Sequence, residues 1–227
     1  MSPLDRRTFI AAGVATLVGC SSTRSGGTDG TVLRPVPGGT IGTSHGAITS
    51  VAMVGDSITE GSADTLTTTL QRAGVENVRI DGKHSRRIEV GNGKGDIPVS
   101  GIVTVYRMLA EGVDPSAWVI ELGTNDVGSY STPEEYGTLI DKIIDMLPPK
   151  KLLVWVNTYR KQFLEATKVF NTVLEQRITA RGNAAVADWY SVASAADQSV
   201  LRSDNLHPNP NGQLALSLLV VQALQGL

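Results

Sequence analysis

Three short motifs, far apart in the sequence, contain residue types that together could catalyse acyl transfer. Ser57 lies in VAMVGDSITEG, Asn125 lies in ELGTNDVG, and DNLH spans Asp204 to His207. A serine hydroxyl becomes a nucleophile when a histidine removes its proton, and a carboxylate can hold that histidine in the required tautomer. An asparagine amide can donate to the oxyanion that forms on the attacked carbonyl. The residue types therefore predict serine esterase chemistry, provided that the fold brings them together.

Each motif also has a structural interpretation. Asp56 and Ser57 follow a run of strand-forming residues, and both residue types cap helices. Asn125 and Asp126 readily form an Asx-type turn. His207 is one of three histidines, and a lone histidine is usually structural or exposed. The position of each motif in the fold must decide between the two interpretations.

Apolar runs and helical stretches alternate along the chain and predict where the motifs lie. Buried strands are predicted at 48–54, 75–80, 118–122, 152–156 and 184–188, and helices at 64–73, 98–111, 133–146, 162–180 and 211–224. Five such alternations predict an α/β fold in which helices cover both faces of a parallel five-stranded sheet. Sites in these folds form at the carboxyl ends of strands, where Ser57 and Asn125 are expected to lie. His207 would approach from the loop before the last helix.

The motifs GDSITEG, GTND and DNLH, in this order and at these strand positions, resemble those of the SGNH hydrolases, also called the GDSL family. The resemblance covers roughly residues 48–224. It implies a flavodoxin-like three-layer fold and a serine esterase or acyltransferase that uses no metal and no cofactor. It also implies that Ser57, His207 and Asp204 are catalytic, and that the Ser57 N–H and the Asn125 side chain hold the oxyanion.

The family has a second block after the second strand, in which a glycine N–H completes the oxyanion hole. The corresponding segment here reads DGKHSRRIEVGNGKGDI and departs from that pattern. Ser85 is the best candidate for the donor because it follows the predicted strand closely, and a backbone N–H serves whichever residue carries it. Gly91, Gly93 and Gly95 remain alternatives.

The same segment is rich in basic residues, which are Lys83, His84, Arg86, Arg87 and Lys94. Such a run commonly forms a solvated surface. Alternatively, Arg86 and Arg87 could bind substrate, either an anionic acyl group or a phosphorylated or carboxylated glycan, because arginine suits bidentate recognition of carboxylates.

The first residues predict export and a lipid anchor. Arg6 and Arg7 precede a short apolar run, as in a twin-arginine signal, and LVGC resembles a lipobox in which Cys20 becomes lipidated. A Sec signal with a chance cysteine is the alternative. We expect a signal peptide over 1–20, a flexible Ser-, Thr-, Gly- and Pro-rich tether over 21–46, and a hydrolase domain over 47–227. The protein would then be anchored to the membrane through Cys20, on the outer face of the cytoplasmic membrane or in the cell envelope of a bacterium.

The net charge and the predicted location limit the kinds of molecule that the protein is expected to bind. The 227 residues carry a net charge of −2, which excludes a strong general attraction to nucleic acid. The predicted location favours an acylated small molecule or glycan as substrate, with a short acyl group on a cell-envelope glycan or glycolipid. An O-acyltransferase acting on envelope sugars, or a non-catalytic glycan-binding lipoprotein, is the alternative. The latter would have no use for Ser57, Asn125, Asp204 and His207 together.

Overall fold

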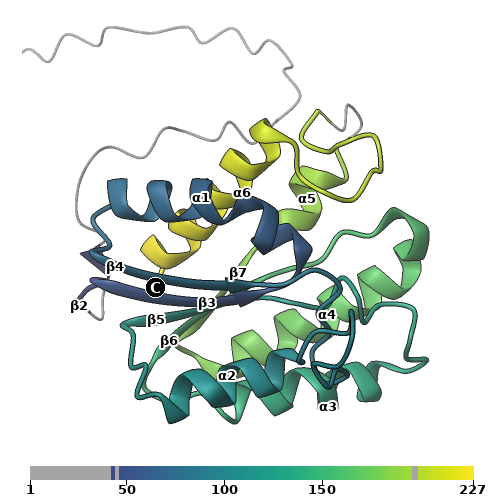
Figure 1. Ribbon diagram of the computed structural model, residues 1–227, viewed down its shortest axis with the longest axis horizontal. Helices are drawn as coiled ribbons and strands as arrows, with labels where there is room; N and C mark the ends of the chain where they lie inside the picture. Colours follow the sequence, from purple (N-terminus) through teal and green to yellow (C-terminus); the bar gives the residue numbers. More distant parts are fainter. Residues whose placement is uncertain (1–41, 44–45, 196–198) are drawn as a thin grey trace, which may run out of the picture. The chain divides into compact units, whose positions relative to one another are not determined.

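The computed structural model describes residues 42–43, 46–195 and 199–227. Its main feature is a parallel sheet of five strands in the order β4-β3-β5-β6-β7 (Figure 1). These strands are β3 (Ser50–Gly55), β4 (Asn77–Gly82), β5 (Ala117–Glu121), β6 (Leu152–Val156) and β7 (Ala184–Ala187). The predicted fold class is confirmed. The strand order reverses between β3 and β5, so the carboxyl ends of these two neighbours form the switch point at which such sheets bind ligands.

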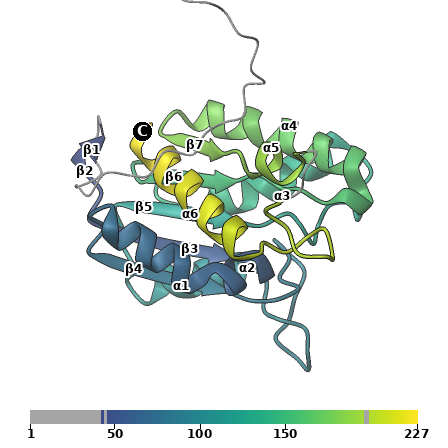
Figure 2. The same ribbon diagram turned by 90° about the horizontal axis from the view of Figure 1, so that it is seen from above.

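Helices cover both faces of the sheet (Figures 1 and 2). One face carries α1 (Ser57–Arg72) and α6 (Pro210–Gln225), and the other carries α2 (Gly101–Ala110), α3 (Pro133–Ile144) and α4 (Leu164–Arg181). Side chains of β3 alternate between the two cores, with Val51 and Met53 on the α1 side and Ala52 and Val54 on the other. A strand buried on both faces needs no polar alternation, which explains the continuous apolar runs in the sequence.

Local capping sets where the helices begin. The Asp56 side chain accepts a hydrogen bond from the Ile58 N–H at 2.9 Å, so α1 begins at Ser57 and not at the predicted residue 64. Thr132 and Glu135 form a capping box, and α3 begins at the predicted residue 133. The short helix α5 (Trp189–Ala193) was not predicted, and the first residues of the helix predicted at 162–180 belong to the 3₁₀ helix η1 (Lys161–Phe163).

Two short strands lie at the end of the predicted tether, residues 21–46. Strand β1 (Gly42–Thr43) pairs with β2 (Gly46–Ala47). The predicted signal peptide, Cys20 and the tether up to residue 41 lie outside the described residues. Within the described ranges, no helix has both the length and the apolar character needed to cross a bilayer.

Candidate active site

The turn between β3 and α1 presents Ser57 at the carboxyl edge of the sheet. Asp56 provides the helix cap, and Ser57 is the first helical residue, with a partly exposed side chain. The turn is tight, because a Cβ added at Gly55 would lie 1.9 Å from Oγ1 of Thr59. In the GDSI stretch, Asp56 therefore caps the helix and leaves the Ser57 hydroxyl available.

A continuous chain of hydrogen bonds joins Ser57, His207 and Asp204. The His207 Nε2 lies 2.9 Å from the Ser57 Oγ, and the His207 Nδ1 lies 2.9 Å from Oδ2 of Asp204. The other carboxylate oxygen of Asp204 accepts from the backbone N–H groups of Leu206 and His207, each at 2.9 Å. The structure thus brings together the three residues that the sequence placed in two distant motifs.

The loop before α6 is closed by its own backbone, which fixes the imidazole. The Arg202 N–H donates to the His207 carbonyl at 2.8 Å, next to a bridge between Leu201 and Pro208. The helix that follows is fixed relative to α1, because the Gln213 side chain donates to the Gly61 carbonyl at 2.8 Å. The elements that carry His207 and Ser57 are therefore tied to one another directly.

The charge state of Asp204 suits a residue that orients an imidazole. Desolvation alone would raise its pKa, but the N–H and imidazole of His207 and the N–H of Leu206 together lower the pKa to about 2. Asp204 is therefore ionised at neutral pH. An ionised acceptor beside Nδ1 favours the tautomer that carries the proton there, which leaves Nε2 free to accept the Ser57 proton.

A buried carboxyl group that sequence reasoning missed supports the turn from below. Glu121 ends β5, and its Oε2 accepts from the Thr59 hydroxyl at 2.8 Å and from the N–H groups of Asp56 and Thr59 at 3.2 Å. Burial, followed by the charge of Asp56, raises the Glu121 pKa well above its usual value. Burial also raises the pKa of Asp56 to about 6. The available signal was a glutamate ending the otherwise apolar strand AWVIE.

Asn125 lies between the turn that carries Ser57 and the segment that follows β4. Its Nδ2 donates to Oδ2 of Asp56 and to the carbonyl of Arg86, each at 3.1 Å. A backbone turn is present here, because the Asp126 N–H donates to the Gly123 carbonyl at 2.8 Å, but the Asp126 side chain accepts from the distant Ile88 N–H and not from the turn, so this is not the predicted Asx-type turn. An oxyanion beside Asn125 would share one of the two amide hydrogens in a three-centre bond.

Ser85 lies in an exposed turn after β4. It is exposed, and its φ of 58° lies in the left-handed region that favours glycine. Among the described residues, neither the Ser85 N–H nor the Ser57 N–H donates a hydrogen bond. Asn125 connects the two positions, because it binds the neighbour of each, Asp56 and Arg86.

The glycines considered as alternatives to Ser85 lie farther along the segment. Gly91, Gly93 and Gly95 all have positive φ, and the bridge between Asn92 and Val99 lies in the same stretch. A Cβ at Gly91 would lie 2.3 Å from the Pro98 carbonyl, so Gly91 allows the segment to pack on itself. These observations favour Ser85 over the three glycines.

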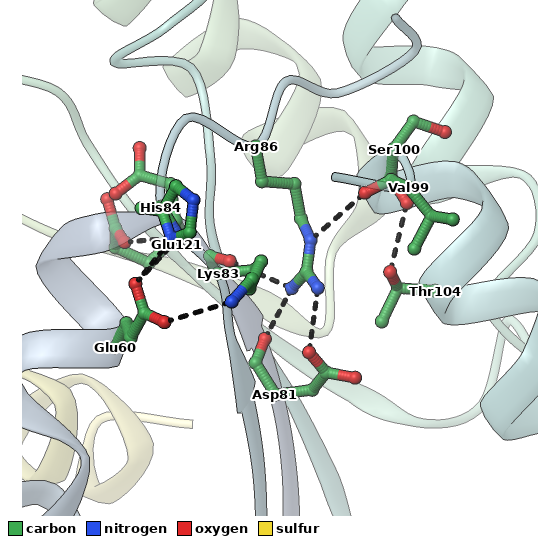
Figure 3. A network of polar contacts seen from close by, with 11 residues as sticks. Glu60, Asp81, Lys83, His84, Arg86, Val99, Ser100, Thr104 and Glu121 are labelled. Carbon is green, nitrogen blue, oxygen red and sulfur yellow. Dashed lines mark hydrogen bonds and ion pairs between the residues drawn. The ribbon is translucent and has the colours of Figure 1, made fainter. Parts of the chain in front are cut away.

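The predicted role of Arg86 in substrate binding is wrong. Arg86 is 2% exposed, and its guanidinium donates to the carbonyls of Gly55, Asp81 and Val99 and to the Asp81 carboxylate (Figure 3). Four acceptors therefore surround the group, and burial closes it to a ligand. The carbonyls come from separate parts of the chain, so Arg86 joins β3, β4 and the start of α2.

The Arg87 side chain contacts Asp126 and Tyr130 and remains partly exposed. Its Nε donates to Oδ1 of Asp126 at 3.3 Å, and its guanidinium lies 5.8 Å from the ring centre of Tyr130. Asp126 is fully buried and also accepts from the Ile88 N–H at 3.0 Å. Burial raises the Asp126 pKa to about 6, and the charge of Arg87 opposes this shift. The Arg87 side chain retains 26% exposure.

No group of three or more His, Cys, Asp or Glu side chains is placed to hold a metal ion within the described ranges. The site offers a serine hydroxyl hydrogen-bonded to an imidazole, an ionised carboxylate on the other side of that imidazole, and the free backbone N–H groups of Ser57 and Ser85.

Comparison with known proteins identifies what the chain resembles. The model of the GDSL-like Lipase/Acylhydrolase family matches residues 53–215. The C-terminal catalytic domain of peptidoglycan O-acetyltransferase A from Streptococcus pneumoniae is similar in structure, with a TM-score of 0.61 and 19% identity over 78% of this chain and 93% of that chain.

Two further solved structures share the fold. TesA has a TM-score of 0.58 and 19% identity over 77% of this chain and 97% of its own. An aryl esterase from M. smegmatis has a TM-score of 0.58 and 14% identity, over 76% of this chain and 96% of its own. A search of curated protein sequences gave no match.

Proposed function

Since the chain belongs to the GDSL-like lipase/acylhydrolase family, and is thus an ester-hydrolysing enzyme, we propose that Ser57 is its nucleophile, with His207 as base and Asp204 as orienting residue. The observation that carries this proposal is the unbroken chain of hydrogen bonds through Ser57 Oγ, the two ring nitrogens of His207 and the Asp204 carboxylate. Both contacts around the imidazole lie within the range for proton transfer.

The reaction follows from this geometry. Ser57 Oγ attacks the ester carbonyl while its proton passes to the His207 Nε2, and Asp204 stabilises the resulting imidazolium. His207 then returns the proton to the leaving alcohol, and an acyl-serine remains. Water, activated by the same nitrogen, attacks the acyl carbon, releases the acid and restores the Ser57 hydroxyl.

Three donors are assigned to the oxyanion that forms in both steps. The free N–H groups of Ser57 and Ser85 supply two, and the Asn125 amide supplies a shared third. Removal of one such donor typically costs about 2.7–4 kcal/mol of transition-state stabilisation. Free backbone donors suit this role because the fold fixes them before the substrate arrives.

The proposed substrate is an ester carried by a cell-envelope glycan or glycolipid, with a short acyl group. Support comes from the sequence, in which the twin arginines and the lipobox-like Cys20 favour an exported, lipid-anchored enzyme. Cys20→Ala should then release the protein from the membrane fraction, and Arg6→Lys with Arg7→Lys should block export. A Cys20 variant that stays as tightly membrane-bound as the wild type would exclude the lipid anchor.

Acyl transfer to a sugar hydroxyl is a second candidate function. It is favoured by the structural likeness to a peptidoglycan O-acetyltransferase domain, and the same triad would serve both reactions. The acceptor differs, because a sugar hydroxyl replaces water in the second step. Assays that follow acylated sugar and free acid in parallel separate the two functions.

Labelling with a serine-reactive fluorophosphonate tests the assigned nucleophile. The wild-type protein should be labelled and should hydrolyse p-nitrophenyl acetate, and Ser57→Ala should lose both properties. Because the side chain is partly exposed and outside both cores, the thermal midpoint of this variant should stay within about 4 °C of the wild type. Undiminished turnover by Ser57→Ala would exclude Ser57 as nucleophile.

A further inference from the structure

The turn that carries Ser85 needs a restraint that its own sequence does not supply. A non-glycine residue rarely adopts a positive φ, yet Ser85 holds a φ of 58° in an exposed turn. Within the turn, the Arg86 N–H donates to the Lys83 carbonyl at 3.2 Å. Other elements must keep the turn in place.

One restraint comes from the first turn of α1. Oε2 of Glu60 accepts from the His84 N–H at 2.8 Å, directly before Ser85 (Figure 3). The same carboxylate lies 3.4 Å from Nδ1 of His84 and 3.6 Å from Nζ of Lys83. Glu60 thus binds the two residues that precede Ser85, through one backbone donor and two side chains.

The other restraint follows Ser85. Arg86 is buried and held by backbone carbonyls, and its own carbonyl accepts from Asn125. The approach to the turn is also close, because a Cβ at Gly82 would lie 2.4 Å from the Glu60 nitrogen. Ser85 is therefore fixed on both sides, by Glu60 through His84 and by the buried Arg86.

We propose that Glu60 is a positioning residue for the oxyanion hole, because it holds the Lys83–Ser85 turn against the helix that begins with Ser57. This inference rests on the proposed function of Ser57 and Ser85. Glu60 and Ser57 share the first turn of α1, so one rigid element sets the places of both the nucleophile and the second oxyanion donor. Loss of the hydrogen bond between Glu60 and the His84 N–H would let the Ser85 N–H move, and the positions of Ser57, His207 and Asp204 would not change.

The basic residues of this segment acquire a role from this arrangement. Lys83 and His84 face Glu60, Arg86 faces Asp81, and each contact holds the segment to the fold. The cluster that the sequence suggested as a substrate-binding patch is, at these positions, part of the support for the oxyanion donor.

Two substitutions separate the roles of the carboxylate. Glu60→Ala removes the acceptor for the His84 N–H, whereas Glu60→Gln keeps an oxygen for this hydrogen bond and removes only the charge. Glu111→Ala is a matched control, because Glu111 is a half-exposed glutamate that pairs with Arg79 at the end of α2.

Steady-state kinetics with p-nitrophenyl acetate, fluorophosphonate labelling rates and thermal midpoints test the proposal. Glu60→Ala should lower kcat and the labelling rate by about ten- to a hundredfold, with KM and the thermal midpoint nearly unchanged, because it misplaces a donor to the transition state. Glu60→Gln and Glu111→Ala should stay within about threefold of the wild type in kcat.

The outcomes separate this inference from the function on which it rests. A wild-type enzyme whose labelling does not depend on Ser57 would overturn the proposed function itself. With Ser57-dependent activity present, a Glu60→Ala kcat within about twofold of the wild type would overturn the positioning role. A Glu60→Gln variant as impaired as Glu60→Ala would also overturn it, because the hydrogen-bond acceptor would then not be the feature that matters.

Discussion

His207 and Ser57 are 150 positions apart in the chain, yet the His207 Nε2 lies 2.9 Å from the Ser57 Oγ. Ser57 is held by the turn after the first strand of the sheet, and His207 by a closed loop before the last helix. The contact between Gln213 and Gly61 joins the two helices beside this pair. The distance between Ser57 and His207 is therefore fixed by local contacts around each residue and by one contact between the two helices.

Asp204→Asn should lower kcat by roughly 10³–10⁴-fold while KM changes little. The asparagine oxygen can still accept from the N–H groups of Leu206 and His207, so the loop should keep its form. However, a neutral amide cannot stabilise the imidazolium. Kinetics and the thermal midpoint check this, with the exposed Asp114→Asn as control. A variant within about tenfold of the wild type would show that Asp204 is only a loop residue.

Asn125→Ala should lower kcat by about a hundred- to a thousandfold, because it removes a side-chain donor. Ser85→Ala and Ser85→Gly should change kcat by less than about tenfold, because each keeps the backbone N–H. Kinetics on proteins of matched circular dichroism test the contrast. If Ser85→Ala is as harmful as Asn125→Ala, the Ser85 hydroxyl takes part in the reaction. If Asn125→Ala is harmless, its contacts to Asp56 and Arg86 are structural alone.

The buried Glu121 should make the wild type less stable as the pH rises. Burial raises its pKa in the folded state, so the folded protein keeps a proton that the unfolded chain has already lost above about pH 4.5. The free energy of unfolding therefore falls with rising pH. Glu121→Gln should reduce this slope above about pH 4.5, because it keeps an oxygen for Thr59 and has no charge.

Urea unfolding at several pH values measures the effect of Glu121, with Glu111→Gln as control. Part of the slope should remain in Glu121→Gln, because burial also raises the pKa of Asp56 and of Asp126, each to about 6. Identical slopes in Glu121→Gln and the wild type would contradict the predicted role of the buried proton.

Arg86→Leu should destabilise the fold by about 3 kcal/mol, because the carbonyls of Gly55 and Asp81 would lose their charged donor. By comparison, Arg79→Leu breaks an exposed pair with Glu111 and should cost at most about 1 kcal/mol. Chemical denaturation of both variants gives the two values. A stable Arg86→Leu enzyme with a strongly raised KM would instead restore the substrate-binding role.

The sequence predicted the bounds of strands and helices best where hydrophobic pattern or helix capping alone determines them. The run at 152–156 predicted β6 with its observed bounds, because a strand buried on both faces must be apolar throughout. The helix predicted at 133–146 begins at its predicted residue, because Thr132 and Glu135 form a capping box within one turn. The start of α1 was placed too late, because the residues at 57–64 include small and β-branched types with weak helical preference, and the Asp56 cap determines the outcome.

The sequence by itself determined the sheet, the order of the motifs and the residue types of the proposed triad, because these depend on hydrophobic pattern and on which side chains can perform the chemistry. Only the tertiary structure decided how Arg86 and Glu121 are used. Carbonyls from three separate segments converge on Arg86, and N–H groups on both sides of Ser57 converge on Glu121. The sequence does not show whether a charged side chain is buried or exposed. The acceptors or donors that stabilise it in the interior are brought together only when distant segments of the chain pack.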